Sequence, residues 1–217
     1  MIKVENLRTF NWEGALRGLR NPMNSWVKSD STFDENGNII NIGENDLRLM
    51  KTLFKAGTEH RKYLRQIFVS MDITAPLYWI SELDTYKVGT VRNSCSFMHK
   101  GVSKPFEISD FSTHDILIDG IPTNVKVWKT IVDTLNQLRE EYLDTKDNNI
   151  FQQIRCLLPC GYNQRFTITM NYENVFTIIH QRSGHRLDEW NEFVEVLKTL
   201  PYVQELLSAL DEKETKQ

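Results

Sequence analysis

Two short segments alternate apolar and polar residues. Residues 67–74 (IFVSMDIT) and residues 166–172 (FTITMNY) each place an apolar side chain at every second position. Successive side chains of a strand point to opposite faces of a sheet, so both segments are predicted to be half-buried strands. Ala75-Pro76 ends the first strand, and Pro76 suits the first position of a following helix.

Apolar residues spaced three and four apart predict helices elsewhere. The clearest helix covers residues 122–143, where Thr123 or Asn124 can cap its start. A helix after the polar residues 29–46 is expected to begin at Asn45 and to stop at Gly57. The other predicted helices cover residues 77–87, 148–158, 173–181, 187–198 and 201–210.

Three further segments are predicted to be loops or a frayed end. Residues 29–46 are polar and contain the turn dipeptide Asn36-Gly37, so this loop can fold as a hairpin. Residues 88–100 (VGTVRNSCSFMHK) lack periodicity, and residues 211–217 are expected to fray. A few strands among several helices predict a single α+β domain over residues 1–217.

Composition adds limits on the class of protein. The chain has 217 residues, a net charge of −3 and 40% hydrophobic residues, as an ordinary soluble globular protein does. No apolar run can cross a bilayer, the N-terminus lacks a secretory h-region, and three cysteines suit a reducing compartment. We therefore expect a cytoplasmic protein without a membrane partner. The near-neutral charge argues against nucleic-acid binding.

Glycine usage constrains how the chain can bind phosphate. None of its ten glycines forms a cluster, which excludes a dinucleotide-binding fingerprint or a phosphate loop built on glycine spacing. Any phosphate site must therefore use side chains, and arginine is the best suited because its planar guanidinium binds phosphate oxygens in pairs.

Three polar segments are candidates for such a site. Residues 82–99 gather cations, hydroxyls and an amide, although a solvated loop has the same composition. Residues 158–186 contain three arginines that can converge on phosphate, or that can make weak surface ion pairs. Residues 58–66 form a charged turn before the first predicted strand. The residues singled out are Lys87, Arg92, Asn93, Ser94, Ser96, His99, Arg165, Arg182, His185, Arg186, Arg65 and Gln66.

Other chemistries have weaker support. Cys156 and Cys160 with His180 and His185 could be drawn as a zinc site, but the cysteine spacing is not that of a usual knuckle, so no metal is predicted. No spacing indicates an acid–base pair, and the chain has no Gly-x-Ser-x-Gly motif.

In this order, the elements from about Asp46 to Trp190 resemble those of the flavin-dependent thymidylate synthases. The best matches are the strand-Ala-Pro-helix step at Ala75-Pro76 and the Leu-Pro-x-x-x-x-x-Arg step that ends at Arg165. The resemblance implies an α+β fold with a small, mostly antiparallel sheet flanked by helices.

The family signature is only partly kept. The family has Arg-His-Arg, a serine, Asn-Glu, a second serine and Arg-Tyr. Residues 85–87 (TYK) align with Arg-His-Arg, Thr90 with the first serine and, after a one-residue insertion, Asn93 with the asparagine. Ser94 falls on the glutamate, Ser96 on the second serine and Met98-His99 on Arg-Tyr. Upstream, Gln66 stands where many members carry a flavin-contacting histidine.

The resemblance implies an enzyme that methylates C5 of dUMP to give dTMP. FAD, reduced by NADPH, would supply the hydride and methylenetetrahydrofolate the carbon, in a homotetramer with ligands at subunit interfaces. Carried over by position, Arg165 would hold the dUMP phosphate, with Ser96 and Ser94 beside it. The residues implied to contact FAD are Gln66, Lys87, Thr90, Asn93 and Arg182.

Because the signature has changed, three other functions stay open. A relative could modify another pyrimidine nucleotide, since the altered loop lies on the substrate side. A binding protein could keep the scaffold and bind a nucleotide or flavin without catalysis. The chain could also be a structural or interaction protein.

Overall fold

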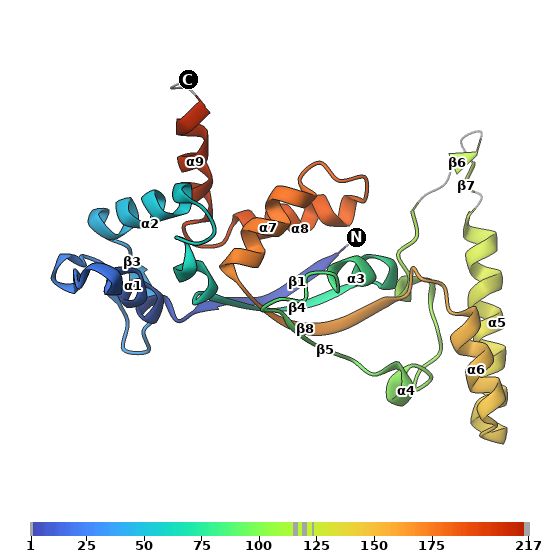
Figure 1. Cartoon of the computed structure of the whole chain (residues 1–217). Coiled ribbons are helices and arrows are strands. Elements are labelled where there is room, and N and C mark those ends of the chain that lie inside the picture. The colour runs from blue at the N-terminus through green and yellow to red at the C-terminus, as the bar shows by residue number, and fades with distance from the viewer. Residues whose placement is uncertain (1, 115–116, 119–120, 123, 215–217) are drawn as a thin grey trace. The chain divides into compact units, whose positions relative to one another are not determined.

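The computed structural model describes residues 2–114, 117–118, 121–122 and 124–214, with the backbone alone for residues 117–118, 121–122, 124–125 and 211–214. The strands are β1 (Lys3–Phe10), β2 (Thr32–Phe33), β3 (Ile39–Asn41), β4 (Phe68–Pro76), β5 (Val91–Ser94), β6 (Leu117–Ile118), β7 (Ile121–Pro122) and β8 (Asn163–Asn171). The helices are α1 (Trp12–Arg20), α2 (Glu44–Ala56), α3 (Leu77–Leu83), α4 (Phe97–Lys100), α5 (Asn124–Thr145), α6 (Asn148–Leu157), α7 (Tyr172–Arg182), α8 (Asp188–Lys198) and α9 (Val203–Glu214). Figure 1 shows these elements along the chain.

The main sheet has the strand order β1-β4-β8-β5. The predicted alternation holds in β4, where Val69, Met71 and Ile73 are buried and the residues between them are partly exposed. In β8, Phe166, Ile168 and Met170 are buried in the same way. The predicted α+β fold with a small, mostly antiparallel sheet is confirmed.

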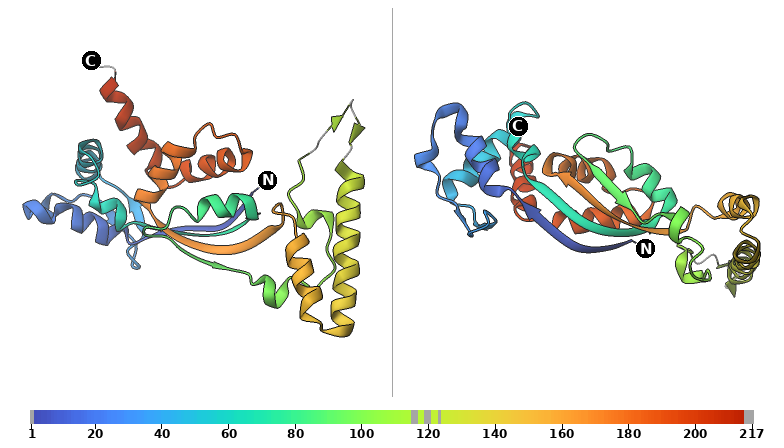
Figure 2. Two further views of the ribbon diagram at one scale, coloured as in Figure 1. Left: turned by 45° about the vertical axis from the view of Figure 1, so that its right-hand side comes forward. Right: turned by 90° about the horizontal axis from the view of Figure 1, so that it is seen from below.

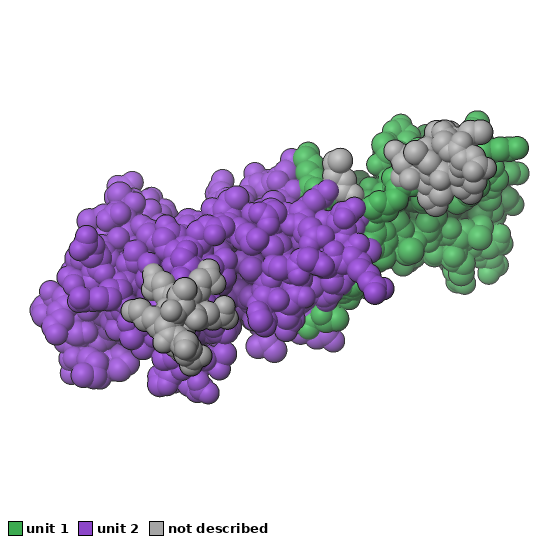
Figure 3. Space-filling view, turned by 90° about the horizontal axis from the view of Figure 1, so that it is seen from above, with its two compact units in different colours: residues 1–3, 74–85, 93–166 green, residues 4–73, 86–92, 167–217 purple. Residues whose placement is uncertain are grey.

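The chain forms two compact units, coloured separately in Figure 3. Unit 1 comprises Met1–Lys3, Thr74–Thr85 and Asn93–Phe166, and unit 2 comprises Val4–Ile73, Tyr86–Arg92 and Thr167–Gln217. Strands β1, β4, β5 and β8 each contribute residues to both units.

Unit 2 is built around large buried aromatic residues. The ring of Trp12 on α1 lies edge-on to Tyr172 on α7, with 5.2 Å between their centroids, and Trp190 on α8 is fully buried. Helix α7 packs against α8, and α2 packs against α9. The polar segment before α2 contains the β2–β3 hairpin, which turns at Gly37 with a φ of 74°, as the Asn-Gly dipeptide predicts.

Unit 1 contains a second apolar cluster. Helices α5 and α6 lie side by side in both views of Figure 2, and Leu135 and Ile154 lie in their shared core. Phe97 of α4 and Phe151 of α6 belong to the same cluster. Within the described residues, none of the helices has the length and apolarity that crossing a membrane requires.

Some predicted boundaries were wrong. Residues 88–100 contain β5 and α4 rather than a plain loop. Helix α3 ends at Leu83, four residues early, and α9 continues to Glu214 because residues 211–214 (DEKE) still favour a helix. Helix α2 begins after Gly43 rather than at Asn45, because the Asp30 carboxylate accepts hydrogen bonds from the first amides of α2. Position 123 lies outside the described residues.

Candidate functional site

A cavity of about 240 Å³ lies in unit 1, where the segment after β5 meets the start of β8. Its lining carries two lysines and one arginine, and within the described residues no acidic side chain lines it. The polar residues at its wall include Ser96, Lys100, Lys104, Tyr162, Gln164 and Arg165. The cavity can therefore accept an anionic group of a small ligand.

Two hydrogen bonds fix the cavity wall. The Cys95 amide donates to the Arg165 carbonyl at 2.8 Å, and the Gln164 side-chain amide donates to the Cys95 carbonyl at 2.8 Å. These bonds hold the segment that carries Ser96 against the start of β8, which carries Arg165. Ser96 and Arg165 are 69 residues apart in the chain, and both line this cavity.

The two motifs that match the family best also meet in unit 1. The amides of Leu77 and Tyr78, at the start of α3, donate to the carbonyls of Tyr162 and Cys160 at 3.1 and 3.0 Å. The first amides of a helix have no partner within the helix. Here the residues that follow Leu158-Pro159 satisfy two of them, which brings the Ala-Pro-helix step and the Leu-Pro step side by side.

Charge at the cavity is modulated by Asp110. Lys104 donates to the Asp110 carboxylate at 2.7 Å, and this hydrogen bond raises the pKa of the Lys104 ammonium. Burial, reinforced by the charge of Asp110, raises the pKa of the Tyr162 hydroxyl. Both groups therefore stay protonated at neutral pH, and Tyr162 can donate a hydrogen bond. Lys100 is exposed, and no ion pair of its ammonium occurs within the described residues.

In unit 2, the turn between α3 and β5 is held by the first residues of α7. The side-chain amide of Asn174 donates to the Val88 carbonyl and to the Thr90 hydroxyl oxygen, each at 2.8 Å. Gly89 has a φ of 74°, and a Cβ there would lie 2.3 Å from the Asn171 side-chain nitrogen. A side chain at this position would be strained, so glycine is favoured there. The hydrogen bonds from Asn174 hold Val88 and Thr90 of the turn against α7.

Arg182 lies in an aromatic cluster of unit 2. Its guanidinium carbon is 4.4 Å from the Trp190 ring centroid and 5.6 Å from that of Tyr86. Its Nε donates to the Tyr86 hydroxyl at 2.9 Å, and its Nη1 lies 3.1 Å from Nε2 of His185. Tyr86 donates in turn to Gln181 at 3.0 Å. Arg182 therefore has structural partners inside its own unit.

No protein-family model and no curated protein sequence matches this chain. Solved structures do match. Thymidylate synthase X (ThyX) from Helicobacter pylori, determined with FAD and dUMP, has a TM-score of 0.67 and 16% identity, over 97% of this chain and 99% of that one. This chain has the ThyX fold.

A second match is PolB from Streptomyces cacaoi, described as a UMP/dUMP methylase. With 5-Br UMP bound, it has a TM-score of 0.66 and 13% identity, over 96% of this chain and 94% of that one. With 5-Br dUMP bound, the TM-score is 0.59 and the identity 14%. At these identities the matches establish the ThyX fold alone.

Within the ThyX fold, the residues predicted to bind the nucleotide share unit 1. Ser96 and Arg165 line the cavity. Ser94 ends β5, directly before the cavity residue Cys95. Asn93 is on the same strand and is exposed.

The residues predicted to contact FAD are mostly in unit 2. Lys87 is exposed, Thr90 is partly buried and Arg182 has the contacts given above. Gln66 ends a short 3-10 turn, and its carbonyl accepts from the Asn11 side chain at 2.8 Å. The roles of all of these residues stay predictions.

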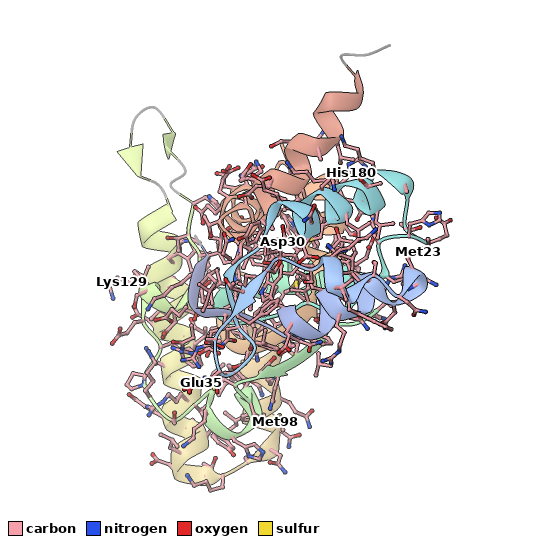
Figure 4. The ribbon with its side chains drawn as sticks, turned by 90° about the vertical axis from the view of Figure 1, so that its left-hand side faces the viewer. Met23, Asp30, Glu35, Met98, Lys129 and His180 are labelled. Carbon is pink, nitrogen blue, oxygen red and sulfur yellow. The ribbon has the colours of Figure 1, made fainter. Side chains whose placement is uncertain are left out.

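Two cations at the unit 1 cavity, Lys100 and Lys104, were not singled out from the sequence. The signature motif ends at His99, and Lys100 is the next residue. Met98, which aligns with the signature arginine, is 65% exposed and is labelled on the short helix α4 in Figure 4. Lys100 lies two residues after Met98, so its position next to the missing arginine could have indicated it as a phosphate ligand.

Proposed function

We propose that this chain is a flavin-dependent enzyme that methylates a pyrimidine nucleotide, with dUMP as its substrate and dTMP as its product. The ThyX fold supports the proposal, and the cationic cavity of unit 1 is the observation that carries it. The phosphate of a nucleoside monophosphate is a dianion. The cavity offers it cations and hydroxyl hydrogen-bond donors.

In this proposal, three residues of unit 1 bind the phosphate. Arg165 provides a guanidinium that can bind two phosphate oxygens, Lys100 provides a second positive charge, and the Ser96 hydroxyl donates a hydrogen bond. Lys100 takes the role of the arginine that the family carries at the position of Met98. Lys104 contributes less, because Asp110 already binds its ammonium.

The donor set of unit 2 fits the phosphates of FAD. Lys87 has an exposed ammonium, and Thr90 accepts a bond from Asn174 while its own O–H can donate. Arg182 adds a guanidinium, and Gln66 adds an amide suited to carbonyl and ring nitrogen atoms. Asn93, which belongs to unit 1, stays a FAD contact implied by the family signature alone. When bound, FAD would supply the hydride, while the residues of this chain bind and orient the reactants.

The remaining reaction partners follow from the same proposal. Methylenetetrahydrofolate would supply the carbon and NADPH the reducing equivalents. The active form would be a cytoplasmic homotetramer of a single-domain chain, without nucleic-acid or membrane partners. Within the described residues, no group of three or more His, Cys, Asp or Glu side chains is arranged to hold a metal ion.

A second candidate is methylation of UMP. It is favoured by the match to PolB, which is described as a UMP/dUMP methylase. A third possibility, a binding protein without catalysis, would keep the nucleotide cavity and lose turnover.

The first test is flavin binding. Purified protein is expected to carry FAD or to take it up, as measured by the visible absorbance of bound flavin. Protein that neither retains nor binds FAD would contradict the flavin enzyme. The holoprotein is then titrated with dUMP, UMP, dCMP and dTMP by calorimetry. Tighter binding of dUMP supports the first candidate, and equal binding of UMP supports the second.

Turnover separates an enzyme from a binding protein. Holoprotein with dUMP, methylenetetrahydrofolate and NADPH is expected to form dTMP, detected by chromatography. Flavin and nucleotide binding without product would favour the binding protein.

A further inference from the structure

A second cationic cavity lies entirely within unit 2. It has a volume of about 350 Å³ and lies where the end of α1 meets the start of α2. Its lining includes Arg20, Lys28 and Arg48, and within the described residues no acidic side chain lines it. Ser25 and Asn45 add polar groups. The volume falls in the range of small-molecule sites.

Arg20 forms the inner part of this cavity. Its side chain is 4% exposed, and its Nε donates to the Asp46 carboxylate at 2.6 Å. Its Nη1 donates to the Ser25 carbonyl at 3.4 Å, which is a long hydrogen bond. Its Nη2 is buried and has no hydrogen-bond partner.

Asp46 does not balance the whole cluster. One of its oxygens binds Arg20, and the other accepts from the Ser29 and Ser31 hydroxyls at 2.7 Å each. The carboxylate is therefore fully used by Arg20 and the serine loop. The charges of Lys28 and Arg48 stay without a matching acid in the cavity, and Arg48 donates only to the neutral Asn45 side chain at 3.1 Å.

A buried guanidinium nitrogen without a partner is costly, because the group loses its hydrogen bonds to water and gains none. Such a group in a folded protein calls for an explanation, and an unoccupied position for water or an ion is a usual one. The cavity lining carries three cations, Arg20, Lys28 and Arg48, and no acidic side chain among the described residues. This charge favours an anion over water in the cavity.

We propose that this cavity of unit 2 binds a phosphate group of a small metabolite. Arg20 forms the rigid inner wall of the site, since the ion pair with Asp46 holds its guanidinium in place. Lys28 and Arg48 are exposed, so they can close on the phosphate oxygens from the rim. No residue of this site belongs to the proposed dUMP or FAD contacts, so the inference does not depend on the proposed function.

The test measures binding of inorganic pyrophosphate by isothermal titration calorimetry at fixed ionic strength. The parent protein carries Lys100→Ala and Arg165→Ala, so that the unit 1 cavity does not contribute. Saturable binding is expected in this parent. Adding Lys28→Ala and Arg48→Ala is expected to raise the Kd at least tenfold. Both side chains are exposed, and a thermal melt checks that each variant is folded.

The matched control adds Arg17→Ala and Lys51→Ala to the same parent. It removes the same charge from α1 and α2 at positions outside the cavity lining, and its Kd is expected to stay within twofold of the parent. If pyrophosphate binding weakens equally in both variants, the loss is due to the change in net charge, and the proposal is overturned. A parent that shows no saturable binding would also overturn it, and would assign water to the cavity.

Discussion

Three arginines of unit 2, Arg20, Arg61 and Arg182, are buried or partly buried, whereas Arg165 and Lys100 at the unit 1 cavity are exposed. In unit 2, Arg20 pairs with Asp46, and Arg61 binds Glu173 through two nitrogens, the shorter distance being 2.7 Å. Arg182 packs on the Trp190 ring. In unit 1, Arg165 and Lys100 line a cavity with no acidic residue in its described lining.

Positively charged side chains are therefore expected to have two different roles, stabilising the fold and binding a ligand. A cation with a buried acid or an aromatic ring stabilises its unit, so its removal should lower the free energy of unfolding. An exposed cation at a cavity wall should affect ligand binding and leave stability nearly unchanged. The following predictions test this division from the largest expected effect to the smallest.

The largest effect is expected for Asp46→Asn. This change leaves the Arg20 guanidinium buried without its counter-charge, and breaking a buried pair costs about 3–5 kcal/mol. Urea denaturation measures the loss. Glu35→Gln, an exposed residue between β2 and β3 of the same unit, is the control and should cost far less. A similar loss in both variants would show that the Arg20–Asp46 pair is not a special point of stability.

The same pair predicts a pH dependence. Burial alone would raise the pKa of the Asp46 carboxyl, but hydrogen bonds from Ser31, Ser29, Arg20 and the Asp30 amide hold it below its ordinary value of 3.8. The unfolded chain binds the proton more tightly, so this stabilisation is complete above the ordinary pKa and is lost as the pH falls through the folded pKa. Between pH 5 and about pH 3, the unfolding free energy of the natural chain should fall more than that of Asp46→Asn.

At the unit 1 cavity, Arg165→Ala is expected to weaken nucleotide binding by about 1.5–3 kcal/mol, the scale of hydrogen bonds to a charged group. Its unfolding free energy should change by less than about 0.5 kcal/mol. Calorimetry with dUMP measures the first quantity and urea denaturation the second. Lys129→Ala on α5 removes a 70% exposed charge of the same unit and should change neither. Unchanged dUMP binding would remove Arg165 from the proposed site.

Arg182→Ala should show the opposite pattern. Loss of its contact with the Trp190 ring and of its hydrogen bond to Tyr86 should lower the unfolding free energy by about 1–2 kcal/mol. Arg186→Ala, an exposed arginine after the same helix, is the control. If Arg182 also contacts FAD, its variant will bind FAD more weakly even at temperatures where it is folded. A variant with normal stability and weak FAD binding would place Arg182 with the ligand-binding cations.

The sequence predicts β4, β8 and the long helices from α2 onward because the responsible signals are local, whereas β1 and α1 were not predicted. The alternation in β4 and β8 and the periodicity of α5 each lie within one segment. Strand β5 and helix α4 were missed because they are held by partners far along the chain, such as the Arg165 carbonyl that accepts from Cys95. Four-residue elements carry too little periodicity to be recognised without those partners.

For the candidate site, too, the residues in local motifs were predicted and the contacts between distant residues were not. Ser96 and Arg165 were predicted from the family motifs and do line one cavity. The partners of Arg182 were not predictable, because Tyr86 lies 96 residues away in the chain. Sequence spacing brought Arg165 and Arg182 together as one phosphate cluster, yet the two belong to different units and have different surroundings.

The smallest effect is expected for Lys100→Ala. Its side chain is exposed and flexible, so dUMP binding should weaken by about 0.5–1.5 kcal/mol, less than for Arg165→Ala. Lys100→Arg should keep the affinity, and His99→Ala, the exposed neighbour outside the cavity lining, should leave it unchanged. If Lys100 and Arg165 bind one phosphate, the double variant will lose less or more than the sum of the single losses. Strict additivity, or no effect of Lys100→Ala, would mean that Arg165 binds the phosphate without Lys100 and that nothing in this loop replaces the signature arginine lost at Met98.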